Sequence, residues 1–216
     1  MVRLPWEITR DMFLSEKEVN RLLSHLDQRV SKAANGDLLA AETDRLIIVT
    51  LLYSGIRTTE FCSLLVSDFV TNSRESSLQV RGRGKGGRTV YLPSRVAQLV
   101  RRYVAETRPA FLPDEVSTKD TKQALVFNEH RRPYERTALY RRVVRILTEA
   151  GLGDRASVQL LRHTYGFLAY LRTGGNLLFV QRQLGHAHPM ITSIYAQFVD
   201  ESYPDLADML SEKKFR

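Results

Sequence analysis

The sequence predicts a mainly α-helical fold with one small antiparallel β-sheet or hairpin. Several segments carry apolar residues at spacings of three and four, as on one face of a helix. One stretch, residues 77–92, instead has β-branched and aromatic flanks around a glycine-rich turn, which is typical of a hairpin. No internal repeat or long linker divides the 216 residues, whose length suits one large domain or two small ones.

Seven helices are expected in chain order. They cover about residues 14–34, 38–54, 58–65, 94–106, 135–150, 160–173 and 176–184. The first begins with a capping-box pattern, Ser15 with Glu18, and Asn35-Gly36 ends it. The second is apolar nearly all round near its end, which predicts a central position, and Gly55 breaks it. Arg57 therefore lies at the junction with the short third helix.

The remaining helices follow the hairpin. Pro93-Ser94 begins the fourth, and residues 108–122, which hold two prolines and several charges, are expected to form a loop. A short apolar segment, Leu125-Val126-Phe127, comes next. The fifth helix has arginines on one side and apolar residues on the other. Gly174-Gly175 separates the last two helices, and residues 204–216 form an amphipathic tail.

The chain is basic: 32 Lys and Arg residues against 24 Asp and Glu give a net charge of +8. That charge suits either an ordinary basic protein or one that binds phosphates. Its distribution favours phosphates, because the planar fork of arginine matches phosphate oxygens. One basic cluster lies in the hairpin: Arg81, Arg83, Lys85 and Arg88. A second cluster lies further along: Arg131, Arg132, Arg136, Arg141, Arg142 and Arg145.

Composition disfavours several other classes of protein. Cys62 is the single cysteine, so no disulfide forms within the chain, and a reducing cytoplasm is the expected location. No apolar run approaches the ~20 residues of a membrane span, so no membrane partner is expected. The N-terminus lacks the core of a signal peptide. No Cys, His or carboxylate cluster has the spacing of metal ligands, so neither a metal nor another cofactor is expected.

One ordered set of residues suits the attack on a DNA phosphodiester. Tyr195 stands nine positions after His186 and can act as the covalent nucleophile. Arg57 and Arg162 can each give forked hydrogen bonds to the two non-bridging oxygens, on which charge grows during the reaction. Lys85, on a flexible hairpin, suits protonation of the leaving 5′ oxygen.

His163 and His186 complete the set, either by supporting proton transfer or by adding contacts to the phosphate. Each residue also has an ordinary explanation. Tyr195 can pack at a helix end, Arg57 can pair locally with Glu60, and a lysine in a glycine-rich turn is usually just solvated. The set gains weight because its members occur together in one order.

The sequence resembles the catalytic domain of tyrosine recombinases, the phage integrase and Xer-type family, from about Phe13 to Asp200. Three short motifs, called boxes, carry the resemblance. The boxes are LLYSGIRTTE at 51–60, LRHT at 161–164, and LGH with IY at 184–186 and 194–195. The resemblance implies cleavage and rejoining of double-stranded DNA through a 3′-phosphotyrosyl bond, without ATP or metal. It also implies that Glu60 buttresses Arg57, that His186 helps to hold the phosphate, and that copies self-associate on DNA in a tetrameric synapse.

Two departures from the family pattern bear on the chemistry. Gln159 stands three residues before Arg162, where the family usually has histidine or lysine, and glutamine can hydrogen-bond a phosphate but cannot act as a base. In the hairpin, an ungapped register puts Arg83 at the family's lysine position, whereas Lys85 needs a slip of two residues. Lys85 is favoured because lysine can release a proton near neutral pH, and Arg83 stays open as the alternative.

The resemblance also divides the chain. Residues 1–12 are expected to be an N-terminal extension, residues 13–200 the catalytic domain and residues 201–216 a C-terminal tail. Family members usually add an N-terminal helical domain that clamps the other face of DNA, so the chain is either a minimal version or the catalytic half of a longer protein. The tail either passes to a neighbouring copy or folds back on its own core. A non-catalytic DNA-binding relative and a type IB topoisomerase stay as alternatives to a site-specific recombinase or integrase.

Overall fold

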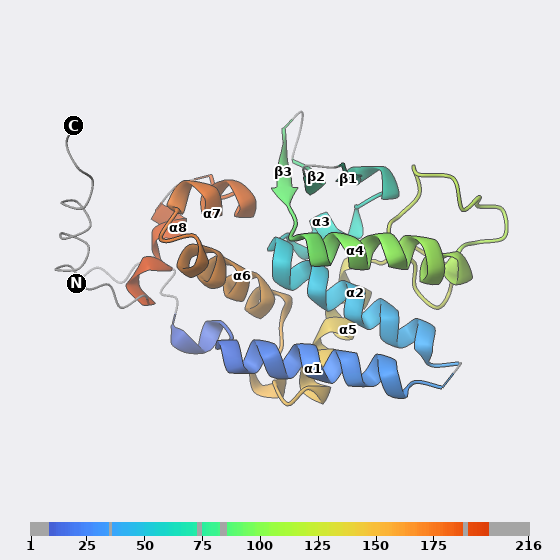
Figure 1. Ribbon diagram of the computed structural model, residues 1–216, viewed down its shortest axis with the longest axis horizontal. Coiled ribbons are helices and arrows are strands. Elements are labelled where there is room, and N and C mark those ends of the chain that lie inside the picture. Colours follow the sequence, from blue (N-terminus) through green and yellow to red (C-terminus); the bar gives the residue numbers. More distant parts are fainter. Residues whose placement is uncertain (1–8, 35, 73–74, 83–85, 188–189, 199–216) are drawn as a thin grey trace.

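In the computed structural model, helices surround the long helix α2 and a small sheet lies at one edge (Figure 1). The structure describes residues 9–34, 36–72, 75–82, 86–187 and 190–198. The helices are α1 (Glu16–Lys32), α2 (Leu38–Ser54), α3 (Thr58–Cys62), α4 (Ser94–Arg102), α5 (Arg136–Glu149), α6 (Val158–Arg172), α7 (Leu177–Leu184) and α8 (Met190–Ser193). The strands are β1 (Phe69–Thr71), β2 (Ser76–Arg81) and β3 (Gly87–Tyr91). The predicted fold class is confirmed, and no helix in these ranges is long and apolar enough to cross a membrane.

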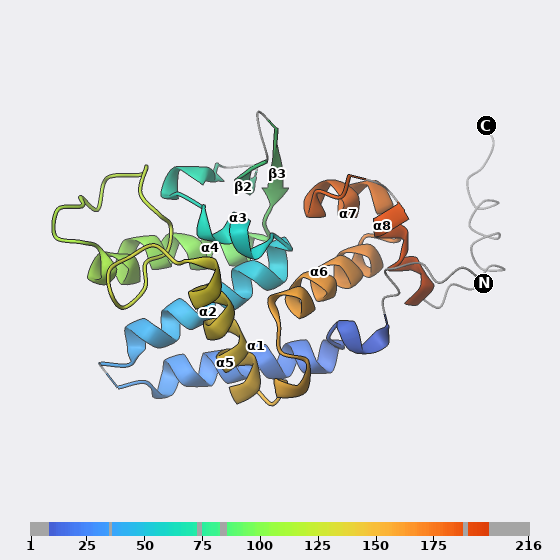
Figure 2. The same ribbon diagram turned by 180° about the vertical axis from the view of Figure 1, so that it is seen from behind.

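The helix α2 has the central position that its sequence predicts, since it packs against α1, α4, α5 and α6. α4 lies on one face of α2 and α5 on the opposite face, as Figure 2 shows from behind. The apolar residues of its second half, Leu46, Ile47, Ile48, Leu51 and Leu52, are buried. Full burial of one such side chain contributes about 1.5–3 kcal/mol. The helix ends at Gly55, where φ is 62° and an added Cβ would lie 2.4 Å from the Tyr165 ring.

The sheet has the strand order β1-β2-β3 and is antiparallel throughout. β2 and β3 are the predicted hairpin, with Leu78 opposite Val90 and Arg81 opposite Gly87. Leu78 and Val90 are buried and turn one face of the hairpin towards the core. β1, which pairs Phe69 with Leu78, was not predicted, because three residues are too few to show an alternating pattern.

The connection between α4 and α5 departs from the prediction. α4 ends four residues earlier than expected, and Tyr103–Thr107 continues as a π-helical turn and Arg108–Phe111 as a 3-10 turn. Arg108, expected to begin an exposed loop, is fully buried. Its Nε and Nη2 donate to the Ala124 carbonyl at 3.0 and 2.8 Å, and its guanidinium lies over the Phe127 ring. Arg108 therefore fastens the long connection back onto the helical core.

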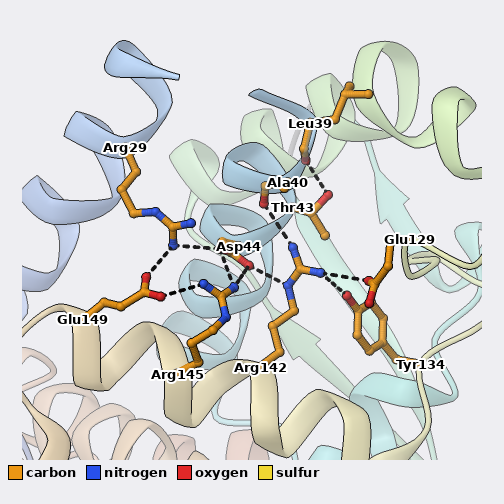
Figure 3. Close-up of polar contacts among 10 residues, drawn as sticks. All are labelled: Arg29, Leu39, Ala40, Thr43, Asp44, Glu129, Tyr134, Arg142, Arg145 and Glu149. Atoms are coloured by element: carbon orange, nitrogen blue, oxygen red, sulfur yellow. Dashed lines mark hydrogen bonds and ion pairs between the residues drawn. The ribbon is translucent and has the colours of Figure 1, made fainter. Parts of the chain in front are cut away.

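One buried carboxylate, Asp44 of α2, joins α1 and α5 to the central helix (Figure 3). Its side chain is 1% exposed and accepts from Arg29 of α1 at 2.8 Å and from Arg142 and Arg145 of α5 at 2.5 and 3.0 Å. Arg142 also donates to the Tyr134 hydroxyl at 2.5 Å. The structure therefore corrects the expectation that the whole second basic cluster faces phosphates, because Arg142 and Arg145 neutralise Asp44.

Replacing Asp44 by alanine is expected to lower the free energy of unfolding by about 3–5 kcal/mol, because it removes the buried carboxylate that three arginines share and leaves Arg142, 15% exposed, with the more distant carboxylate of Glu129 at 3.5 Å. Urea unfolding followed by circular dichroism measures the change. Asp37→Ala is the matched control, since Asp37 precedes the same helix, is exposed and makes no capping hydrogen bond through its side chain. A loss below about 1 kcal/mol for Asp44→Ala would show that the arginines find adequate partners elsewhere.

Candidate active site

The C-terminal end of α7 collects three arginines from three distant segments. The last carbonyl groups of a helix lack partners within the helix, and they lie at the negative end of its dipole. Three successive carbonyls here each accept from one arginine: Gln183 from Arg88 Nε at 2.8 Å, Leu184 from Arg162 Nη2 at 2.7 Å, and Gly185 from Arg57 Nη2 at 3.3 Å. The junction after α2, the strand β3 and the helix α6 therefore meet at one point.

Gly185 makes this helix end possible. Its φ is 64°, in the left-handed region, and its amide donates to the carbonyls of Gln181 and Arg182. The His186 amide also donates to the Gln181 carbonyl at 3.2 Å. An added Cβ at Gly185 would lie 2.9 Å from Arg88 Nη1. Glycine is therefore favoured twice, by the backbone conformation and by the arginine beside it.

Glu60 is a carboxylate shared by two of these arginines. Its oxygens accept from Arg88 Nη1 and Nη2 at 2.7 and 2.9 Å, while Arg57 donates from Nη1 at 2.9 Å and from its backbone amide at 2.7 Å. Burial acts to raise the pKa of Glu60, but the hydrogen bonds and charges of Arg88 and Arg57 outweigh it and hold that pKa at about 2. Glu60 is therefore ionised at any working pH, and it contacts Arg57 as the sequence predicted.

Arg162 of α6 is buried, and its two contacts are backbone carbonyls. Nη1 donates to Gly55, just after α2, and Nη2 to Leu184 at the end of α7. Burial and the neighbouring Arg57 lower the pKa of Arg162 to about 10. The side chain stays protonated near neutral pH, so it brings positive charge into the site without a direct carboxylate contact in the described residues.

Tyr195 lies beside His163 of α6. The tyrosine hydroxyl is 3.1 Å from His163 Nδ1, and the whole residue is only 1% exposed. Burial raises the pKa of Tyr195 to about 12, with Arg162 acting in the opposite direction. Burial and Arg162 both lower the pKa of His163 below its ordinary value. A neutral imidazole with Nδ1 facing a phenol can accept its proton.

His186 follows the helix end directly and is held by Thr192. His186 Nδ1 is 2.9 Å from the Thr192 hydroxyl, and the Thr192 carbonyl accepts from the Tyr195 amide at 3.2 Å. Burial, Arg162 and Arg57 lower the pKa of His186 to about 4, so the ring is neutral at physiological pH. Thr192, which was not predicted to take part, therefore links the histidine to the tyrosine.

The structure brings together six of the predicted site residues: Arg57, Glu60, Arg162, His163, His186 and Tyr195. Gln159 is exposed on the first turn of α6, three residues before Arg162 and so on the same side of the helix. Lys85 and Arg83 lie outside the described residues. In the parts of the chain that the structure describes, no group of three or more His, Cys, Asp or Glu side chains is arranged to hold a metal ion.

The predicted DNA-binding arginines lie in different environments. Arg132, Arg136 and Arg141 are exposed. Arg81 is exposed but pairs with Asp68 at 2.9 Å, and Arg131 pairs with Asp114. Arg88, expected among the DNA contacts, is instead part of the site, bound to Glu60 and to α7. A paired arginine contributes less to DNA affinity, because each ion pair already satisfies part of its fork.

Known proteins resemble this chain in sequence and in overall fold. The model of the phage integrase family matches residues 12–201. The chain belongs to this family. Curated members include the tyrosine recombinase XerD of Chlamydia trachomatis, which is 28% identical over 190 residues, or 88% of this chain. The tyrosine recombinase XerC of Mycobacterium sp. strain KMS is 32% identical over 174 residues, or 79% of this chain. The chain spans 58% and 54% of those two relatives, little more than half of their length.

Solved structures of two recombinases and one integrase share the fold. The XerH site-specific recombinase, in a post-cleavage complex with palindromic difH substrate, matches with a TM-score of 0.72 at 24% identity, over 93% of this chain and 53% of XerH. The XerA recombinase matches with a TM-score of 0.67 at 25% identity, over 99% and 68% of the two chains. The catalytic domain of bacteriophage HP1 integrase matches with a TM-score of 0.56 at 21% identity, over 94% and 95%. The fold is therefore that of a tyrosine recombinase catalytic domain.

Gly166 of α6 leaves the space that Tyr195 occupies in this phage integrase site. A Cβ at Gly166 would lie 2.3 Å from Cζ and 2.5 Å from the hydroxyl oxygen of the tyrosine. Gly166→Ala is therefore expected to push the phenol ring out of its buried position. Nitration by tetranitromethane, which attacks the phenolate, should then modify Tyr195 about as readily as Tyr140, which is 47% exposed.

In the unsubstituted chain, Tyr195 should resist nitration relative to Tyr140, because burial both shields the ring and raises its pKa. Mass spectrometry of the two tyrosine peptides gives both extents in one sample. Gly36→Ala serves as the control, since nothing lies within 4 Å of a Cβ at Gly36. Equal resistance of Tyr195 in both variants would mean that the ring does not depend on the space at Gly166.

Proposed function

We propose that this chain acts as a site-specific recombinase or integrase, which breaks and rejoins double-stranded DNA through a covalent 3′-phosphotyrosyl bond. One observation carries the proposal: arginines grouped around a helix end lie next to a tyrosine hydroxyl that faces a neutral imidazole. Membership of the phage integrase family and the likeness to XerH, solved in a post-cleavage DNA complex, support it. The chain covers about half of that relative, so the activity of a whole recombinase is part of the proposal.

In the proposed step, the Tyr195 oxygen attacks the scissile phosphorus while its proton passes to Nδ1 of His163. The bond between phosphorus and the 5′ oxygen breaks, and that oxygen takes a proton from the hairpin. Lys85 is the proposed donor, with Arg83 as the alternative in the other register. The new phosphotyrosyl ester keeps the energy of the broken bond, so a free 5′ hydroxyl can reverse the reaction without ATP.

Arg57, Arg162 and His186 are proposed to hold the non-bridging oxygens. The two guanidinium groups offset the charge that develops on these oxygens in the transition state. His186 takes part as a neutral donor: in the tautomer whose Nδ1 accepts from the Thr192 hydroxyl, Nε2 carries the ring proton and can donate to the phosphate. Because these groups supply the positive charge, the proposed step uses no cofactor.

The partners of the chain are also part of the proposal. Exposed Arg132, Arg136 and Arg141 would contact the backbone of the duplex, and copies would assemble on DNA as a tetramer. The proposed catalytic domain comprises residues 13–200, with residues 1–12 as an extension. Residues 201–216, outside the described residues, are the proposed tail, exchanged between copies or folded back. We place the activity in the cytoplasm, since its substrate is DNA and the single cysteine, Cys62, needs no oxidising compartment.

The alternative is a DNA-binding relative that does not cleave, and Gln159 is the observation that keeps it open. Covalent trapping separates the two functions. The substrates are nicked DNA duplexes whose sequence is randomised around the nick, so that no target sequence has to be assumed. Cleavage near the nick releases a short strand that carries the 5′ hydroxyl, and loss of this strand prevents religation. Adducts that survive SDS identify cleaved sequences, which then serve as defined substrates.

Tyr195→Phe is expected to abolish the SDS-resistant adduct while leaving DNA affinity within about twofold, because the ring remains and only the hydroxyl is lost. Tyr140→Phe is the control, since Tyr140 is an exposed tyrosine of α5. Gel electrophoresis measures the adduct, and fluorescence anisotropy measures binding. If Tyr195→Phe still forms the adduct, Tyr195 is not the nucleophile; if the unsubstituted chain forms none across the pool, the chain only binds.

Cleavage is expected to require neutral His163, which sets its pH dependence. The pKa of His163 lies below its ordinary value of 6.5, so the active neutral form predominates above that pH. The rate should therefore be higher at neutral pH and fall as the pH drops through the lowered pKa. Initial rates at subsaturating DNA report the free protein. His163→Gln should lower the rate by about 10²–10⁴-fold and flatten the acid limb. An acid limb unchanged in His163→Gln would assign the titration to another group.

A further inference from the structure

Arg88 of β3 makes contacts unlike those of a DNA-binding residue. Its side chain is 16% exposed. Nη1 and Nη2 donate to the two oxygens of Glu60 at 2.7 and 2.9 Å, and Nε donates to the Gln183 carbonyl at 2.8 Å. A forked pair of this kind is the strongest contact between an arginine and a carboxylate. Arg88 is therefore committed to the protein, although it stands in the basic hairpin.

The geometry at Glu60 matters because Arg57 competes for the same carboxylate. Arg57 reaches Glu60 through one side-chain atom, Nη1, and donates from Nη2 to the Gly185 carbonyl, while 47% of its side chain stays exposed. If Glu60 were free to fork with Arg57, the pair would be neutral and the planar fork of Arg57 would turn from the substrate to the carboxylate. The fork position on Glu60 is occupied by Arg88.

We propose that Arg88 is a positioning residue: by holding Glu60 in a fork, it leaves Arg57 its charge and its orientation for the scissile phosphate. This inference rests on the proposed DNA cleavage. Arg57 has two partners, Glu60 and the Gly185 carbonyl at the end of α7. Arg88 forks with Glu60 and also donates to the Gln183 carbonyl at the same helix end, which accepts from Arg162 as well. One side chain therefore fixes both partners of Arg57.

A positioning role and a purely structural role differ in their dependence on the charge of the substrate. A methylphosphonate at the scissile position replaces one charged oxygen by a methyl group, so it demands less positive charge from Arg57. If Arg88 acts through Arg57, its loss should affect the charged phosphodiester far more than the neutral methylphosphonate. If Arg88 merely fastens the hairpin, its loss should slow both substrates equally.

The experiment compares single-turnover cleavage of the two substrates by the full chain, using a sequence recovered from the randomised pool. Arg88→Gln is expected to slow cleavage of the phosphodiester by about 10²-fold, the usual effect of losing one donor to a developing oxyanion. Cleavage of the methylphosphonate should fall by no more than about threefold. Arg155→Gln is the control, since Arg155 forms a partly buried ion pair with Glu18 outside the site and should slow neither substrate.

A double substitution tests the mechanism even if Arg88→Gln is poorly folded. Removing the charge of Glu60 as well, in Arg88→Gln/Glu60→Gln, frees Arg57 and should restore phosphodiester cleavage by about tenfold over Arg88→Gln. Equal slowing of both substrates by Arg88→Gln, or a double variant no faster than the single one, overturns the positioning role while cleavage itself stands. Absence of any adduct from the unsubstituted chain overturns the proposed function and this inference together.

Discussion

The negative end of α7 is the feature on which the rest of the site depends. The last carbonyls of a helix generally lack partners within it, and three successive carbonyls at this end each accept from a different arginine. Those arginines come from segments that are far apart in the chain, and three cations brought together in water would repel one another. The partial negative charge of the helix end, together with Glu60, offsets that repulsion. The helix end thereby converts separate sequence boxes into one site.

The site nevertheless keeps a surplus of positive charge, because three guanidinium groups face one carboxylate. The surplus adds to the effect of burial on its neighbours: burial first, and nearby arginines next, lower the pKa of Arg162 to about 10 and that of His186 to about 4. For Tyr195 the two effects oppose each other, and burial prevails over Arg162 to raise the pKa to about 12. A bound phosphate would supply the missing negative charge, so it would relieve the repulsion among the cations as it places phosphorus in reach of the tyrosine.

The sequence predicts those parts of the structure that are encoded locally. The helix ends at Gly55 and Gly185 and the pairing of Arg57 with Glu60 each depend on a few adjacent residues. The role of Arg88 could not be predicted in this way, because its partner carbonyl is 95 positions away in the chain. The same limit explains the second basic cluster: the sequence shows a run of arginines, but not the carboxylate of Asp44, 98 positions from Arg142, that pairs with Arg142 and Arg145. Propensity and periodicity describe neighbours along the chain, whereas these charges find partners across the core.

Asp44 and Glu60 show that one kind of ion pair can serve two purposes, according to whether its exposed arginine lies in the site. Arg145, a partner of Asp44, is 46% exposed but lies outside the site. Asp44 is enclosed, and Arg142 beside it is 15% exposed, so exchanging that carboxylate for another anion would require opening the packing of α2 against α5. Glu60 forks with the equally enclosed Arg88, yet its second partner, Arg57, is 47% exposed. Arg57 is still hydrated, and it can exchange water for phosphate oxygens without losing its carboxylate. The number of arginines on a surface therefore overstates its capacity to bind phosphate. The carboxylates that contact each arginine decide whether that arginine stays available for a phosphate.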